Sequence, residues 1–187
     1  MASLILNGNT SGSVTISSPA VSGTTTLTLP TTSGTVLTNG TNTNFPAGSV
    51  LQVVQGTYTT QISLSSPASG TITATGLTAS ITPKSSSSKI LIMTSNQAWF
   101  QNTSTALYGH YIIYRNTSTG IFVEGAADQV IATSEFGVRT NIIYLDSPTT
   151  TSSTSYSVSF VNDMQPTNLV LNRNSTPAVI ILMEIAA

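Results

Sequence analysis

The chain has 187 residues and no cysteine, and 6% of its residues are charged, against about 25% in typical soluble domains. Disulfides and thiolate metal sites are therefore excluded, and so few Lys and Arg residues argue against a nucleic-acid backbone or an anionic membrane as partner. No apolar run reaches the roughly 18–20 residues of a membrane helix, and the N-terminus lacks the basic segment of an export signal. We expect a soluble protein made in the cytoplasm.

Residues 1–45 carry no charge, and their apolar residues alternate with small polar ones in short bursts. Gly12, Gly23 and Gly34 recur at equal intervals between the bursts, which predicts a weak repeat of one strand and one turn. The repeat has too little apolar mass to fold alone, and short single strands leave their edges unpaired. We therefore expect a prism-like β stalk in which copies of the chain assemble around a three-fold axis. The alternative is a flexible Ser/Thr linker.

The apolar positions of this stalk are the candidate contacts between chains: Val14, Ile16, Leu27, Leu29 and Val36.

Residues 46–187 contain longer alternating segments, separated by loops rich in Ser, Pro, Gly and Asn. The pattern predicts strands at 50–55, 58–64, 72–74, 77–81, 89–94, 107–115, 121–124, 129–132, 136–144, 156–160, 169–171 and 179–185. The run KILIMT at Lys89–Thr94 is apolar at consecutive positions, which predicts a strand buried on both faces. Many short strands without a helical stripe favour an all-β fold, here a jelly-roll-like antiparallel β-sandwich.

The side chains that carry chemistry are few. His110 is the one histidine, so nucleophilic catalysis lacks the usual partners, and we expect no catalytic residue, no metal site and no cofactor. Glu184 lies inside an apolar strand, which predicts a buried ion pair with Arg115, Arg139 or Arg173.

Three aromatic residues are candidates for contact with a ligand. Trp99 lies in the polar segment NQAWFQN, and Tyr108 and Tyr114 share a strand face with His110. Aromatic rings can stack on sugar rings, so these side chains are the candidate glycan contacts. The alternative for Trp99 is a place in the sandwich core or in a subunit interface.

Several segments resemble one family of viral proteins. GTTTLTLPTTSGTVLT (Gly23–Thr38) is similar to the repeats of fibre and other virion proteins of tailed bacteriophages, especially marine ones. A C-terminal module of the same proteins is similar to the segments Gly76–Ile92, Tyr111–Gly120, Ile142–Val158 and Val179–Ala186. Together these segments cover well over half of the chain. The resemblance implies a structural role in the virion, usually as a homotrimer, and carries over no catalytic residue.

The residues and the resemblance together predict a non-enzymatic virion protein. It would form a trimeric head, collar or tail fibre, or a capsid decoration, and would be assembled in the host cytoplasm. Its partners would be capsid, portal or tail proteins, with the stalk residues contacting either other copies or the capsid, and neither nucleic acid nor membrane. The alternative function is a receptor-binding tip for host surface glycans, and a less favoured one is a polysaccharide hydrolase.

Overall fold

The computed structural model describes residues 3–17, 20, 21, 23, 24, 26, 28, 31–33, 45–101, 106–131, 135–163 and 168–187; the side chains of 3, 106–108 and 124–131 lie outside that description. The chain divides into two compact units, residues 1–36 and 37–187. The division predicted from sequence, into a stalk of residues 1–45 and a domain of residues 46–187, stays a prediction about domain organisation. The described residues contain no helix that is long and apolar enough to cross a membrane.

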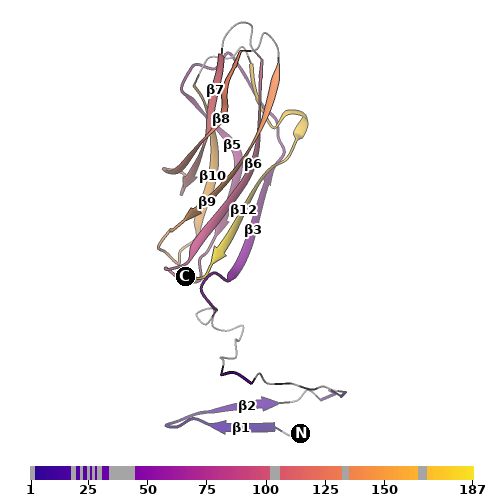
Figure 1. Cartoon of the computed structure of the whole chain (residues 1–187), viewed down its shortest axis with the longest axis vertical. Helices are drawn as coiled ribbons and strands as arrows, with labels where there is room; N and C mark the ends of the chain where they lie inside the picture. Colours follow the sequence, from indigo (N-terminus) through magenta and orange to yellow (C-terminus); the bar gives the residue numbers. More distant parts are fainter. Residues whose placement is uncertain are drawn as a thin grey trace. The chain divides into compact units, whose positions relative to one another are not determined.

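The first unit contains a β-hairpin. Strand β1 (Ser3–Asn7) pairs antiparallel with β2 (Ser13–Ser17), and the Gly8 N–H donates to the Gly12 carbonyl in the turn between them (Figure 1). Gly12 has a φ of 77°, a conformation that glycine adopts without a steric penalty. The sequence pattern did not predict β1. A single hairpin of this kind is marginally stable in water.

The described residues of the second unit form strands and one short 3-10 turn. In chain order the elements are β3 (Val50–Tyr58), β4 (Ile62–Ser65), β5 (Thr71–Ile81), β6 (Lys89–Gln101), β7 (Ala106–Arg115), β8 (Thr119–Ile131), β9 (Phe136–Asp146), β10 (Thr154–Asn162), β11 (Asn168–Leu171), η2 (Arg173–Ser175) and β12 (Ala178–Ile185).

The strands of the second unit form two antiparallel sheets (Figure 1). One has the order β3-β12-β6-β9, and the other has the order β5-β10-β7-β8. Eight strands in these two four-stranded orders make a jelly roll, so the predicted all-β, jelly-roll-like sandwich is confirmed. The short strands β11 and β4 extend the first sheet, because β11 pairs with the end of β6 that β12 does not reach.

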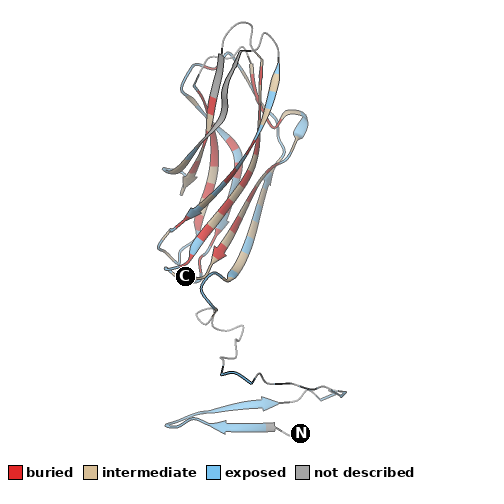
Figure 2. Cartoon of the chain, in the orientation of Figure 1, coloured by how far each residue is buried: buried red, intermediate tan, exposed pale blue. Residues whose placement is uncertain are grey.

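The core lies between the two sheets (Figure 2). Every second residue of β6, from Ile90 to Phe100, is buried, and β12 alternates in the same way. Phe160 is at the centre of an aromatic cluster: its ring centroid lies 4.9 Å from that of Tyr111 and 5.9 Å from that of Phe100. Gly109 allows this packing, since a Cβ there would collide with the Phe160 ring.

Strand β5 differs from its sequence pattern. Two separate strands were predicted on either side of Gly76, but one strand with a bulge is observed. Gly76 has a φ of 77°, and the register with β10 shifts at this point. The alternation continues through the bulge without a change of phase, so that Ile72 faces outward while Leu77 faces the core.

Candidate functional site

One outer surface of the sandwich is aliphatic. The pairing registers place side chains of β3, β12, β6 and β9 in rows on the outward side of their sheet. One row runs from Val53 through Met183 and Leu91 to Leu145, and the next runs from Gln55 through Ile181 and Met93 to Ile143. We call the eight outward aliphatic residues the aliphatic face: Val53, Leu91, Met93, Ile143, Leu145, Val179, Ile181 and Met183.

The aliphatic face is uneven. Val53 at one edge of the sheet is 57% exposed, and Ile143 at the other edge is 67% exposed. Between them lies a hollow of about 200 Å³, lined by residues that include Met93, Val179 and Ile181. The prediction that Lys89–Thr94 is buried on both faces is therefore wrong for the single chain, because the outward residues of this strand are only half-buried.

The opposite outer surface is chemically different. Its central strand β10 presents Ser155, Ser157 and Ser159 outward, paired with β5 on one side and β7 on the other. A hollow of about 520 Å³ lies here, and Tyr114 and Ile72 contribute to its wall. The hollow is lined by aliphatic side chains, by hydroxyl groups and by one aromatic ring.

The hairpin has an aliphatic side of its own. Leu4 pairs with Ile16 and Leu6 pairs with Val14, so these four side chains share one side, which we call the hairpin face. All four are more than half exposed, and Ile5 and Thr15 lie on the other side. The structure thus places two of the five predicted stalk contacts, Val14 and Ile16, side by side. Leu27, Leu29 and Val36 lie outside the described residues.

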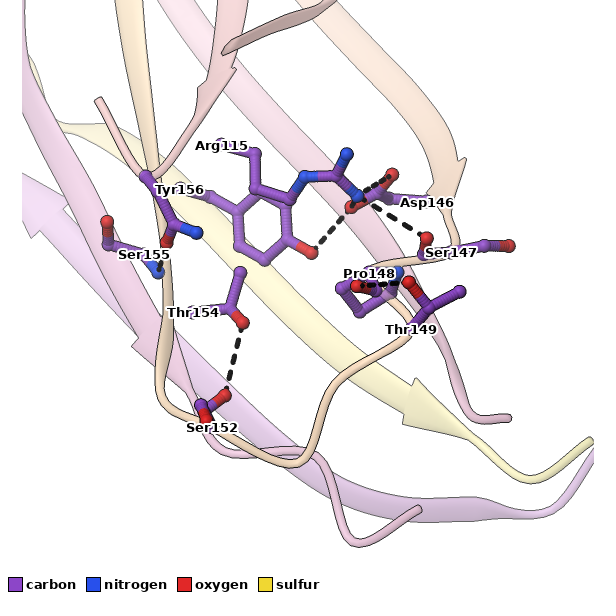
Figure 3. A network of polar contacts seen from close by, with 10 residues as sticks. Arg115, Asp146, Ser147, Pro148, Thr149, Ser152, Thr154, Ser155 and Tyr156 are labelled. Carbon is purple, nitrogen blue, oxygen red and sulfur yellow. Dashed lines mark hydrogen bonds and ion pairs between the residues drawn. The ribbon is translucent and has the colours of Figure 1, made fainter. Parts of the chain in front are cut away.

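A buried polar network joins β7, β9 and β10 (Figure 3). The Arg115 guanidinium donates through Nη1 to both oxygens of Asp146 at 3.1 Å, and the Tyr156 hydroxyl donates to Oδ2 at 2.7 Å. Tyr156 is fully buried, and burial followed by the hydrogen bond to Asp146 raises its pKa far above the ordinary value. The network fixes the end of β9 against β10, and sequence patterns did not predict it.

Glu184 differs from its prediction. The residue is fully buried, but its carboxylate accepts hydrogen bonds from the Gln52 side chain and the Lys84 backbone N–H, each at 2.6 Å. The predicted arginine partner is wrong, because Arg115 pairs with Asp146 and Arg173 with Glu135, while Arg139 donates to Ser95. Two neutral donors satisfy this carboxylate and tie the last strand to β3 and to the loop at residue 84.

Trp99 lies on the outward side of β6, outside the core. The Arg173 guanidinium lies 4.1 Å from the centroid of its ring, and Glu135 pairs with that guanidinium at 3.7 Å. A cation placed over an indole ring interacts favourably with it. One face of Trp99 is thus already covered by Arg173.

The other two candidate aromatic residues, Tyr114 and Tyr108, have different outcomes. Tyr114 is half-buried at the wall of the hollow on the serine side of the sandwich, whereas the side chain of Tyr108 lies outside the described residues. His110 is on the same strand as Tyr114, and its Nδ1 lies 2.7 Å from Asp163 Oδ2. Among the described residues, no group of three His, Cys, Asp or Glu side chains could hold a metal ion.

Comparison with known proteins gives structural similarities alone. No protein-family model matches the chain, and no curated protein matches it. Its structure is similar to the infectious bursal disease virus VP2 subviral particle, with 15% identity and a TM-score of 0.39 over 85% of this chain and 46% of the other. The structure of the Gx strain of the same virus has 15% identity and a TM-score of 0.38, over 83% of this chain and 43% of the other. The T13 particle of that virus has 14% identity and a TM-score of 0.40, over 83% of this chain and 40% of the other. The chain spans less than half the length of each.

Proposed function

We propose that the protein is a non-enzymatic structural component of a virion, and that it forms a homotrimeric fibre or capsid decoration. The observation that carries the proposal is the hairpin face. Four aliphatic side chains on a two-stranded sheet have no core of their own, and burial of each is worth roughly 2 kcal/mol. Assembly of several copies through this face would supply the missing core.

Two further features support this function. The sequence resembles fibre and other virion proteins of tailed bacteriophages over most of its length, including the segment Gly23–Thr38. A jelly roll is an architecture that many viral structural domains use. The partners under this proposal are other copies of the chain and the capsid, portal or tail proteins of the particle.

A pair of hairpin variants tests the stalk. Val14→Asp places a charge on the hairpin face, and we expect it to weaken self-association at least tenfold in sedimentation velocity, because the charge would have to be desolvated. Thr15→Asp is the matched control, since Thr15 is the next residue and lies on the other side of the hairpin. Equal association of the two variants and the wild type would contradict a role for the hairpin face.

A second candidate function is recognition of host surface glycans, and the hollow beside Tyr114 favours it. The hollow of about 520 Å³ combines an aromatic ring with the hydroxyls of Ser157, Ser159 and Thr78. These groups could stack on a sugar ring and hydrogen-bond to its hydroxyls. Trp99 is a poorer candidate, because Arg173 covers its ring.

Tyr114→Ala tests the glycan candidate. We expect this variant to lower adsorption of the purified protein to host cells by tenfold or more, since the stacking surface is lost. Trp99→Ala should leave adsorption unchanged. Circular dichroism would confirm that both variants remain folded, and unchanged adsorption of Tyr114→Ala would exclude this hollow as the glycan site.

A further inference from the structure

The aliphatic face carries fewer polar residues than a sheet face in contact with water normally does. An antiparallel sheet with one solvated face normally alternates apolar and polar residues. Here β6 carries Leu91 and Met93 outward, and β12 carries Ile181 and Met183 outward, between core residues that are also aliphatic. Three adjacent strands, β12, β6 and β9, share this departure from alternation, so it is a property of the surface and not of one strand.

The outward side of the other sheet is mixed. Its strand β10 places Ser155 and Ser157 outward beside the buried residues Tyr156 and Val158, and Ile72 on β5 and Val123 on β8 are each 58% exposed. Polar residues interrupt the rows there, because Ile112 pairs with Ser159 and Val161 pairs with His110. On the first sheet two successive rows are aliphatic across β12, β6 and β9, and a second layer over that sheet would account for the difference.

We propose that the aliphatic face of each copy is covered by a neighbouring copy of this chain in a head-to-tail contact around the three-fold axis. The inference rests on the proposed self-assembly and names the surface of the sandwich that takes part in it. The face is one continuous patch of aliphatic residues on four adjacent strands, and large apolar patches on a protein surface mark interaction sites. Standard interfaces bury about 800 Å² on each partner, so a contact here would also include the polar residues around the patch.

The charge and shape of the face favour another copy of this chain over a different partner. The first charged residues along the outward rows are Lys89 beyond one end and Arg139 beyond the other, and the aliphatic residues lie between them. An equally uncharged aliphatic surface is the partner that leaves no charge desolvated. The face carries protruding side chains at both edges, Val53 and Ile143, and a hollow of about 200 Å³, so an edge of one copy can fit the hollow of the next, as a three-fold contact requires.

Charge variants test the proposal in the full-length chain. Ile143→Lys puts an ammonium on the aliphatic face, where the residue is 67% exposed. Ile72→Lys is the matched control, because Ile72 is 58% exposed on the outer side of the opposite sheet. We expect Ile143→Lys to weaken self-association at least tenfold by sedimentation velocity, and Ile72→Lys to associate like the wild type.

Thiol labelling tests the proposal a second time, without disrupting the assembly. The chain has no cysteine, so Ile143→Cys and Ile72→Cys each carry a single thiol. In the assembled protein we expect the thiol at position 143 to react with a maleimide at least tenfold more slowly than the thiol at position 72. In urea the two rates should be equal. Within an isolated chain, position 143 would react at least as fast, since Ile143 is the more exposed residue.

The outcomes distinguish this inference from the proposed function. If the wild type assembles while Ile143→Lys assembles equally well, or the two thiols react at equal rates, the aliphatic face is not an interface between copies and the inference is overturned. The hairpin face would then be the remaining candidate for the contacts between copies. If the wild type is monomeric at every concentration, the proposed self-assembly fails, and the inference fails with it.

Discussion

Replacing Asp146 by alanine is expected to lower the free energy of unfolding by about 3 kcal/mol. The side chain of Asp146 is 7% exposed, and it accepts hydrogen bonds from both Arg115 and Tyr156. Its removal leaves a guanidinium and a buried hydroxyl without their acceptor, which is more damaging than loss of the bonds alone. For a chain of this size the melting temperature should fall by about 10 °C, measured by calorimetry.

Asp163→Ala is the control for this prediction. Asp163 also pairs with a basic side chain, His110, but both partners are substantially exposed, at 26% and 42% of their side-chain surface. Exposed ion pairs contribute between about 0 and 1 kcal/mol, so this variant should remain close to the wild type. A loss of less than 1 kcal/mol in Asp146→Ala, or equal losses in both variants, would show that the buried network does not hold β9 against β10.

The stability of the protein should fall steeply above pH 10. Burial raises the pKa of Tyr111, and burial together with the hydrogen bond to Asp146 raises the pKa of Tyr156. An unfolded tyrosine loses its proton near pH 10, so above this pH the unfolded chain binds two protons fewer than the folded one. The free energy of unfolding is therefore unaffected by these groups below pH 10 and decreases above it, by about 2.7 kcal/mol per pH unit.

Two phenylalanine variants assign this pH dependence. Tyr111→Phe and Tyr156→Phe should each remove about half of the slope in urea unfolding between pH 10 and 12. At pH 8 they should differ, because the Tyr111 hydroxyl has no hydrogen-bond partner in the described part of the chain, whereas Tyr156 donates to Asp146. Tyr111→Phe should then be nearly neutral, and Tyr156→Phe should cost about 2 kcal/mol. An unchanged slope in both variants would contradict the prediction.

Local sequence patterns predicted the sandwich well, because half-buried β-strands alternate apolar and polar residues. Phe136–Tyr144 and Tyr156–Phe160 were predicted as strands, and they lie within β9 and β10. The failures have local causes. The outward Ile72 and the inward Leu77 lie on either side of a bulge at Gly76 within β5, and their apolar character suggested two separate strands. Strand β1 is a short strand near the N-terminus that pairs with β2.

The polar contacts could not be predicted from the sequence, because they join residues that only the fold brings together. Asp146 lies 31 positions from Arg115, and Glu184 lies 132 positions from Gln52. The expected arginine for Glu184 followed from a general rule about buried carboxylates, but a nearby amide side chain and a backbone N–H satisfy it instead. The aliphatic face did have a signal in the sequence, the run at Lys89–Thr94 with two apolar faces, and a single chain covers only one of them.

We propose that this chain is a self-assembling structural protein with three copies per assembly. The most direct test is the mass of the full-length protein in solution, measured by sedimentation equilibrium over micromolar concentrations. We predict a species with about three times the chain mass of 19.4 kDa, in reversible equilibrium with smaller species on dilution. A folded species of 19.4 kDa that persists up to the highest concentrations would contradict the account.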